Sequence, residues 1–127
     1  LEFLKNTEAS EIETTLIMIP NMLQDFQKYL HLIDLAEMLL KEQQLEGVYQ
    51  IASFHPKYQF ADVNPQDITN YTNRTPYPTI HLLREKSIET AIRSYGDTHT
   101  IPIRNKKLLK SMDESVVKKL SSGKSID

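Results

Sequence analysis

The chain has 127 residues, of which 39% are hydrophobic and 25% are charged, and its formal net charge is −2. Such a chain is typical of one soluble domain, and its charge gives no field that would attract nucleic acid or a membrane surface. The absence of cysteine excludes disulfides, thiolate metal ligands and thiol nucleophiles. No apolar run reaches the roughly 18 residues that span a bilayer, and the first residues lack the pattern of a signal peptide. We therefore predict a cytoplasmic protein that binds neither membrane nor nucleic acid.

The first part of the chain has the pattern of a βαβ unit. Residues 1–6 are predicted to form the end of a helix. Thr14 to Ile19 is an apolar run that Pro20 ends, which predicts a strand buried on both faces. Apolar residues recur every three or four positions from Met22 to Gln44 and predict an amphipathic helix, and Val48 to Phe54 predicts a second strand. Strands joined in this way are normally parallel, so we expect an α/β fold with a small parallel or mixed sheet.

The second part of the chain is predicted to be mainly helical. Pro78 and the apolar stripe that follows it predict a helix from Thr79 to Tyr95. Thr98 to Ile103 has a proline between two isoleucines and predicts a short edge strand. A further helix is expected from Asn105 to about Met112.

We interpret residues 1–118 as a single α/β domain and residues 119–127 as a disordered tail. The C-terminal part is rich in lysine, but acidic residues interrupt the lysines and no aromatic residues lie among them. This pattern favours a solvated surface over a nucleic-acid interface.

The stretch from Ser53 to Glu85 is the candidate functional region, because it links a predicted strand to a predicted helix through about twenty polar and aromatic residues. His55 directly follows the second strand, and ligands in open α/β sheets bind beyond strand ends. His81 and Glu85 are four residues apart and would share one helix face. We predict His55 and His81 as general acid and base groups, with Glu85 as their orienting carboxylate.

A divalent metal is a second hypothesis for this region. Two histidines with Asp67 and Glu85 would suit zinc or iron, although a histidine and a glutamate four residues apart are common in helices. The sequence does not identify any cofactor other than this candidate metal.

Binding of a small anionic ligand is a third hypothesis. Arg74 and Arg84 carry guanidinium groups, which bind carboxylate or phosphate in a bidentate manner. The predicted substrate-binding residues are Tyr58, Asn70, Asn73, Arg74 and Arg84. The chain has only three glycines and no glycine-rich phosphate loop, which excludes the usual nucleotide-binding motifs.

Two structural explanations compete with these functions. Asparagine and threonine side chains bond readily to nearby backbone, so the stretch from Asn70 to Pro78 is also consistent with a rigid loop held by aromatic residues. The chain would then be a non-catalytic interaction or structural module. An enzyme should bring His55, His81 and Arg74 together in one pocket, whereas an interaction module should spread them over a flat face.

Several long motifs resemble an uncharacterised bacterial family catalogued as a domain of unknown function, DUF1415. The motifs are ETTLIMIP at residues 13–20, MLQDF at 22–26, GVYQIASFHPKYQFA at 47–61, NYTNRTPYP at 70–78 and HLLREKSIE at 81–89. The resemblance implies no assigned activity. Its pattern centres on His55, Pro56, Tyr58, Phe60, Asp67, Asn70, Tyr71, Asn73, Arg74, Pro76, Pro78, His81, Arg84 and Glu85.

The resemblance also carries two expectations that differ from this chain. It implies a longer N-terminal part, with a Cys-Pro-Phe segment, a strand and a helix before Leu1. It also implies glycine at the position of Asp62, so the resemblance leaves open whether a tight turn forms there.

Overall fold

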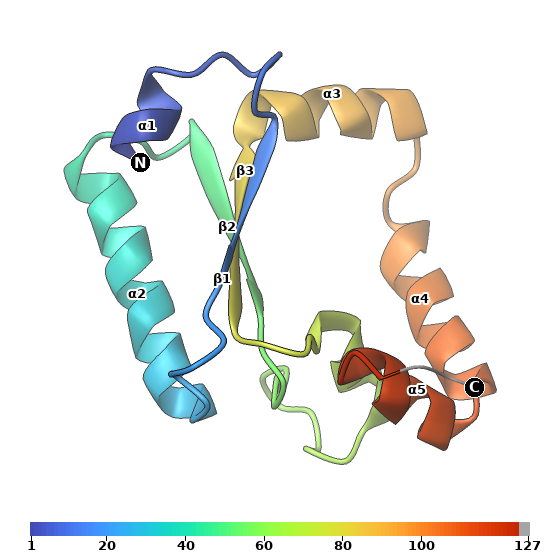
Figure 1. Ribbon diagram of the computed structural model, residues 1–127. Coiled ribbons are helices and arrows are strands. Elements are labelled where there is room, and N and C mark those ends of the chain that lie inside the picture. Colours follow the sequence, from blue (N-terminus) through green and yellow to red (C-terminus); the bar gives the residue numbers. More distant parts are fainter. Residues whose placement is uncertain (125–127) are drawn as a thin grey trace.

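The computed structural model describes residues 1–124, which form a three-stranded sheet with α2 on one face and a helical arm on the other side (Figure 1). The elements in chain order are α1 (Glu2–Lys5), β1 (Thr14–Met18), α2 (Phe26–Glu42), β2 (Tyr49–Phe54), the 3₁₀ helix η1 (Ile68–Asn73), β3 (Thr79–Arg84), α3 (Glu85–Tyr95), α4 (Thr100–Ser111) and α5 (Glu114–Ser121). The predicted class of mixed helices and strands is thereby confirmed. Within the described residues, no helix combines the length and the apolar character that crossing a bilayer requires.

The sheet has the strand order β1-β3-β2, and both of its strand pairs are antiparallel. β1 and β2 run in the same direction, but β3 lies between them and pairs with both. The predicted parallel pairing of the first two strands is therefore wrong. This split βαβ arrangement keeps the connection through α2, while a third strand supplies the hydrogen bonds that a parallel neighbour would have supplied.

Thr79–Arg84 forms strand β3, so the helix predicted for these residues is wrong. Ile80 and Leu82 point to the core, at the spacing of a strand, and are buried. The same apolar residues also continue the helical spacing of the apolar residues in α3, and for this reason the sequence predicted one helix over both segments. The structure begins α3 only at Glu85, so the predicted helix face shared by His81 and Glu85 does not exist.

α2 and the sheet enclose the hydrophobic core. Asp25 caps α2 through a hydrogen bond from the backbone N–H of Lys28 to its carboxylate, so the helix begins later than the predicted Met22. The buried core residues are Leu4, Tyr29, Leu40, Tyr49, Ile80 and Leu82. Burial of a large apolar side chain contributes about 1.5–3 kcal/mol, so this cluster is the main source of stability.

The last third of the chain differs from the sequence prediction at α4 and at α5. The edge strand predicted for Thr98 to Ile103 is wrong, because α4 begins at Thr100. Pro102 lies in its first turn, where the missing proline N–H has no helical partner to lose. α5 extends to Ser121, inside the range 119–127 predicted as a tail, and residues 125–127 lie outside the described residues.

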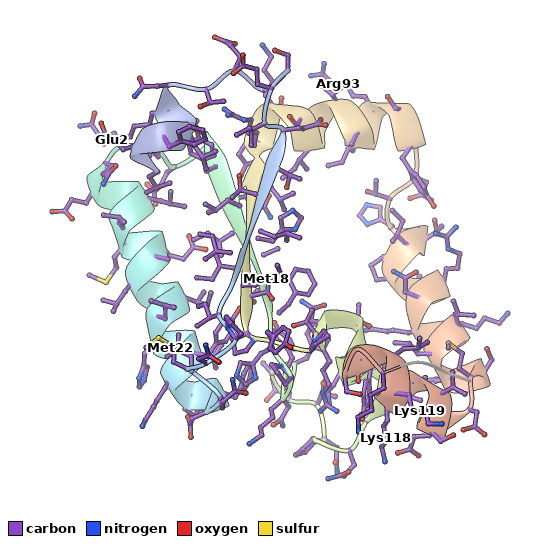
Figure 2. The ribbon with its side chains drawn as sticks, viewed as in Figure 1. Glu2, Met18, Met22, Arg93, Lys118 and Lys119 are labelled. Carbon is purple, nitrogen blue, oxygen red and sulfur yellow. The ribbon has the colours of Figure 1, made fainter. Side chains whose placement is uncertain are left out.

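The face of the sheet opposite α2 is open over much of its area. Leu16 and Met18 of β1 are 56% and 63% exposed, and the register places them on the same face as His81. Figure 2 shows Met18 on the side of the sheet away from α2. α3 leaves the end of β3 on this side and leads to α4, which runs at a distance from the sheet (Figure 1).

Candidate functional site

His55 is fully buried at the end of β2 and uses both of its ring nitrogens. Its Nδ1 accepts a hydrogen bond from the backbone N–H of Lys57 at 2.9 Å, and its Nε2 lies 2.8 Å from the carbonyl oxygen of Leu23. A carbonyl oxygen can only accept, so Nε2 carries the proton and the ring is the neutral tautomer. Burial lowers the pKa of His55, while the bond to Leu23 opposes that shift.

Leu23 contributes to the same arrangement through its backbone. It has a positive φ of 63°, a conformation that leucine adopts only at a cost of about 1–2 kcal/mol. The ring of His55 packs in a tilted arrangement against the rings of Phe26 and Tyr29, with centroid distances of 5.2 and 4.9 Å. His55 thus ties the turn before α2 to the loop after β2.

Arg74 is fixed by the loop that surrounds it. Its Nε donates to the carbonyl oxygen of Tyr58 and its Nη2 donates to that of Pro65, both at 3.0 Å. Its guanidinium carbon lies 4.4 Å from the ring centroid of Tyr71, within the range of a cation–π interaction. Nη1 has no hydrogen-bond partner among residues 1–124.

The two predicted asparagines bond to backbone. Asn70 is fully buried; its side-chain oxygen accepts from the N–H of Phe60, and its amide donates to the carbonyl of Asn64. Asn73 donates to the carbonyl of Ser53. These bonds hold the loop against the end of β2, as expected of buried polar groups.

His81 lies on the other face of the sheet from His55. Its Nε2 is 2.5 Å from the hydroxyl of Thr14, and its ring lies 6.3 Å from that of Phe54. It lines a shallow pocket of about 230 Å³ between β1, β3 and α3. His55 instead packs with the aromatic residues of α2, so the structure does not bring the two histidines together.

Arg84 organises the N-terminal segment. Its guanidinium donates to the carbonyl oxygens of Ile12 at 2.9 Å and Thr7 at 2.7 Å, with longer bonds of 3.4 Å to the carbonyl of Leu4 and the hydroxyl of Tyr49. It joins residues far apart in the sequence to the end of β3 and stands apart from Arg74.

We expect Arg84→Lys to lower the free energy of unfolding by about 1–3 kcal/mol, because one ammonium cannot replace a planar group that bonds to several carbonyls. Urea unfolding followed by circular dichroism measures this loss. Arg93→Lys, an exposed change on α3, is the control and should alter stability by less than about 0.5 kcal/mol. Equal effects of the two substitutions would contradict the structural role of Arg84.

Asp67 caps η1. One of its carboxylate oxygens accepts from the hydroxyl and the N–H of Thr69, and these bonds lower the pKa of Asp67. Within residues 1–124, no group of three or more histidine, aspartate or glutamate side chains lies close enough to hold a metal ion. The predicted set of His55, Asp67, His81 and Glu85 is thus not assembled as a metal centre.

An open cleft of about 500 Å³ lies between the start of α2 and the loop after β2. Its charged lining residues are Arg74, Lys57 and Asp25. The complete set of lining residues is Asp25, Phe26, Gln27, Pro56, Lys57, Gln59, Pro65, Gln66 and Arg74. Of the residues predicted from the sequence, Arg74 lines this cleft, and Tyr58 and His55 support its wall from behind through the contacts described above.

Sequence reasoning missed Lys57 and Tyr29. Lys57 follows the motif histidine by two positions, and no local pattern distinguishes it from a surface lysine. Tyr29 was assigned to the apolar stripe of α2, although a buried tyrosine needs a partner for its hydroxyl. That hydroxyl donates to the carbonyl of Thr79 at 2.6 Å and accepts from the N–H of Phe54 at 3.0 Å.

A split βαβ sheet braced by buried polar side chains, with a cleft at the start of its helix that Lys57 and Arg74 line, defines a small mixed α/β domain. The chain belongs to the DUF1415 family, described as a protein of unknown function, whose family model matches residues 1–119. No curated protein and no solved structure matches the chain. The turn at Asp62 forms with a positive φ of 60°, which aspartate tolerates better than most residues. The strand and helix expected before Leu1 stay a prediction.

Proposed function

We propose that the chain is a binding domain for a small anionic ligand, which it holds in the cleft between the start of α2 and the loop after β2. The observation that carries the proposal is the fixed guanidinium of Arg74 on the cleft wall. Because two carbonyls and a tyrosine ring already hold this group, binding a carboxylate or phosphate would cost little side-chain entropy.

The charges and the size of the cleft support the same ligand class. Lys57 and Arg74 supply two positive charges, and neither forms an ion pair with a residue in the described part of the chain. Asp25 is the one carboxylate among the lining residues, and it already accepts a hydrogen bond from the N–H of Lys28. A volume of about 500 Å³ falls in the range of small-molecule sites.

Binding is favoured over catalysis by the state of His55. Its two ring nitrogens are both engaged with backbone groups, so it has no free position for proton transfer to a ligand. The catalytic roles of His55, His81 and Glu85 stay predictions, and the cleft does not depend on them.

The proposal predicts thermal stabilisation by anions. Citrate or inorganic phosphate at a hundredfold excess over its dissociation constant should stabilise the parent chain by about 2.7 kcal/mol. Lys57→Gln should weaken this binding about tenfold, because one of the two cations is lost. Differential scanning fluorimetry across a ligand titration measures both effects.

The controls separate specific binding from general salt effects. Sodium chloride at matched ionic strength should reproduce none of the shift, and Lys41→Gln at the far end of α2 should bind as the parent does. Arg74→Lys keeps the positive charge but loses the planar group that can donate two parallel hydrogen bonds, so it should bind the anion more weakly than the parent. An anion shift that is equal in the parent and in Lys57→Gln would refute the cleft as the site.

A further inference from the structure

The free edge of β1 is a second surface with unused bonding capacity. β1 is at the outside of the sheet and pairs with β3 along one edge alone. Edge strands in monomers are normally protected by lysine, proline or a bulge. Thr14–Met18 contains no charged residue and no proline, and Leu16, Ile17 and Met18 are 56%, 44% and 63% exposed.

The register identifies the backbone groups that face outward. The N–H of Ile19 bonds to the carbonyl of Pro78, which extends the β1–β3 ladder by one step. In an antiparallel ladder, the hydrogen-bonding direction alternates from residue to residue. Ile17 therefore bonds toward β3, whereas Thr14, Leu16 and Met18 direct their N–H and C=O groups to the free edge.

The exposed area of the chain is large for its mass. The chain exposes 9148 Å², whereas a compact monomer of 14.7 kDa exposes about 6,900 Å². The excess is about 2,200 Å². An obligate homodimer buries about 2,000–5,000 Å² in total, or about 1,000–2,500 Å² from each chain. The excess belongs to the whole chain, and its size lies in the range that each chain of an obligate homodimer buries.

We propose that two copies of the chain associate by antiparallel pairing of their β1 strands around a two-fold axis at Leu16. Leu16 then opposes Leu16 of the second copy, and Thr14 opposes Met18, so that all three outward-facing residues find bonding partners. The result is one continuous six-stranded sheet, whose open face carries Leu16 and Met18 of both copies.

Charge favours this register over a parallel one. β1 is preceded by Glu13 and followed by Ile19 and Pro20. Antiparallel pairing centred on Leu16 places Glu13 beside Ile19 of the second copy, whereas parallel pairing would place the two glutamates side by side. The contact is also self-complementary, as a two-fold interface requires.

The oligomeric state tests the proposal directly. Size-exclusion chromatography with light scattering should give twice the chain mass of 14.7 kDa at micromolar concentration. Leu16→Lys should shift the chain to a monomer, because two lysines would then face each other at the axis. Met38→Lys is the matched control, since Met38 is 65% exposed on α2 and should leave the dimer intact. Circular dichroism checks that both variants are folded.

Cysteine scanning tests the register, because the chain has no cysteine of its own. In the proposed pairing the two Leu16 Cα atoms lie about 5.5 Å apart, whereas the two Met18 positions are separated by about 13 Å along the strands. Leu16→Cys should therefore oxidise to a covalent dimer at least tenfold faster than Met18→Cys.

Three results would overturn the proposal. A monomeric parent chain would leave the β1 edge to a strand from another segment or another protein. A dimer that persists in Leu16→Lys, or equal cross-linking rates at the two positions, would place the interface on another surface. The proposed anion site lies at the start of α2, so each of these outcomes would leave the proposed function to be judged by its own titration.

Discussion

Replacing Tyr29 with phenylalanine is expected to lower the free energy of unfolding by about 2–4 kcal/mol. The Tyr29 hydroxyl lies between β2 and β3, where it accepts from the N–H of Phe54 and donates to the carbonyl of Thr79. The register pairs Phe54 with Thr79, so the hydroxyl occupies the place of the last ladder bond. Its removal would leave two buried backbone groups without partners.

The same hydroxyl should make stability depend on alkaline pH. Burial raises the pKa of Tyr29 to about 12, whereas a tyrosine in the unfolded chain titrates near 10. The folded state therefore keeps a proton that the unfolded state releases. The stability that the protonated Tyr29 hydroxyl contributes is complete below pH 10 and is lost as the pH rises toward 12. The loss in unfolding free energy is about 2.7 kcal/mol for a pKa difference of two units.

Urea unfolding at pH 8 and pH 11.5 measures both effects. The difference in unfolding free energy between the parent and Tyr29→Phe should be largest at pH 8 and should narrow at pH 11.5. Tyr58→Phe is the matched control: its ring packs on Phe26 in the same cluster, and its hydroxyl has no hydrogen-bond partner among residues 1–124. A Tyr29→Phe chain as stable as the Tyr58→Phe chain would refute the bridging role.

The elements that the sequence predicted correctly are those with local signals. The stripe of α2 and the apolar run of β1 each identify the type of element from neighbouring residues. The prediction that β1 is buried on both faces is wrong, because β1 is an edge strand in which Leu16, Ile17 and Met18 are exposed. The sequence of β3 has two interpretations. Thr79 to Arg84 fits a strand because its apolar residues alternate, and it fits a helix because it continues the apolar spacing of α3. The choice depends on β1 and β2, which lie on either side of β3 in space and far from it in the sequence.

The sequence identified polar residues of unusual chemistry, but it did not show which groups they contact. Asn70, Asn73 and Arg84 were recognised as chemically unusual, and each proves to bond to distant backbone carbonyls or amides. Side-chain chemistry alone does not distinguish a group that binds a ligand from one that braces a loop. The distinction requires knowing whether its donors are already used, which depends on tertiary contacts. Two nitrogens of Arg74 brace the loop, and its guanidinium group also lines the cleft.

Replacing His55 with phenylalanine is expected to lower the free energy of unfolding by about 2–4 kcal/mol at pH 7.5. Phenylalanine keeps the aromatic packing against Phe26 and Tyr29 but cannot accept from the N–H of Lys57 or donate to Leu23. The turn at Leu23, with its positive φ, would also lose the bond that holds it.

The pH dependence identifies the protonation state that His55 has in the folded chain. Burial lowers the pKa of the folded imidazole below the value of about 6.5 that histidine has when unfolded. The unfolded state therefore binds a proton first as the pH falls. The stability contributed by His55 is complete above pH 6.5 and is lost as the pH falls toward the folded pKa. The difference between the parent and His55→Phe should consequently narrow from pH 7.5 to pH 5.5.

Urea titrations of the parent and of His55→Phe at these two pH values measure that narrowing. His31→Gln, on the exposed side of α2, is the control and should change the free energy of unfolding by less than about 0.5 kcal/mol at either pH. A difference that widens in acid would mean that the folded chain favours the charged imidazole. The N–H of Lys57 would then no longer have an acceptor at Nδ1, and that nitrogen would carry a proton beside the anion cleft. His55 would then have to be reconsidered as a proton donor to the proposed ligand. The narrowing that we expect would instead restrict His55 to supporting the cleft wall that carries Arg74 and Lys57.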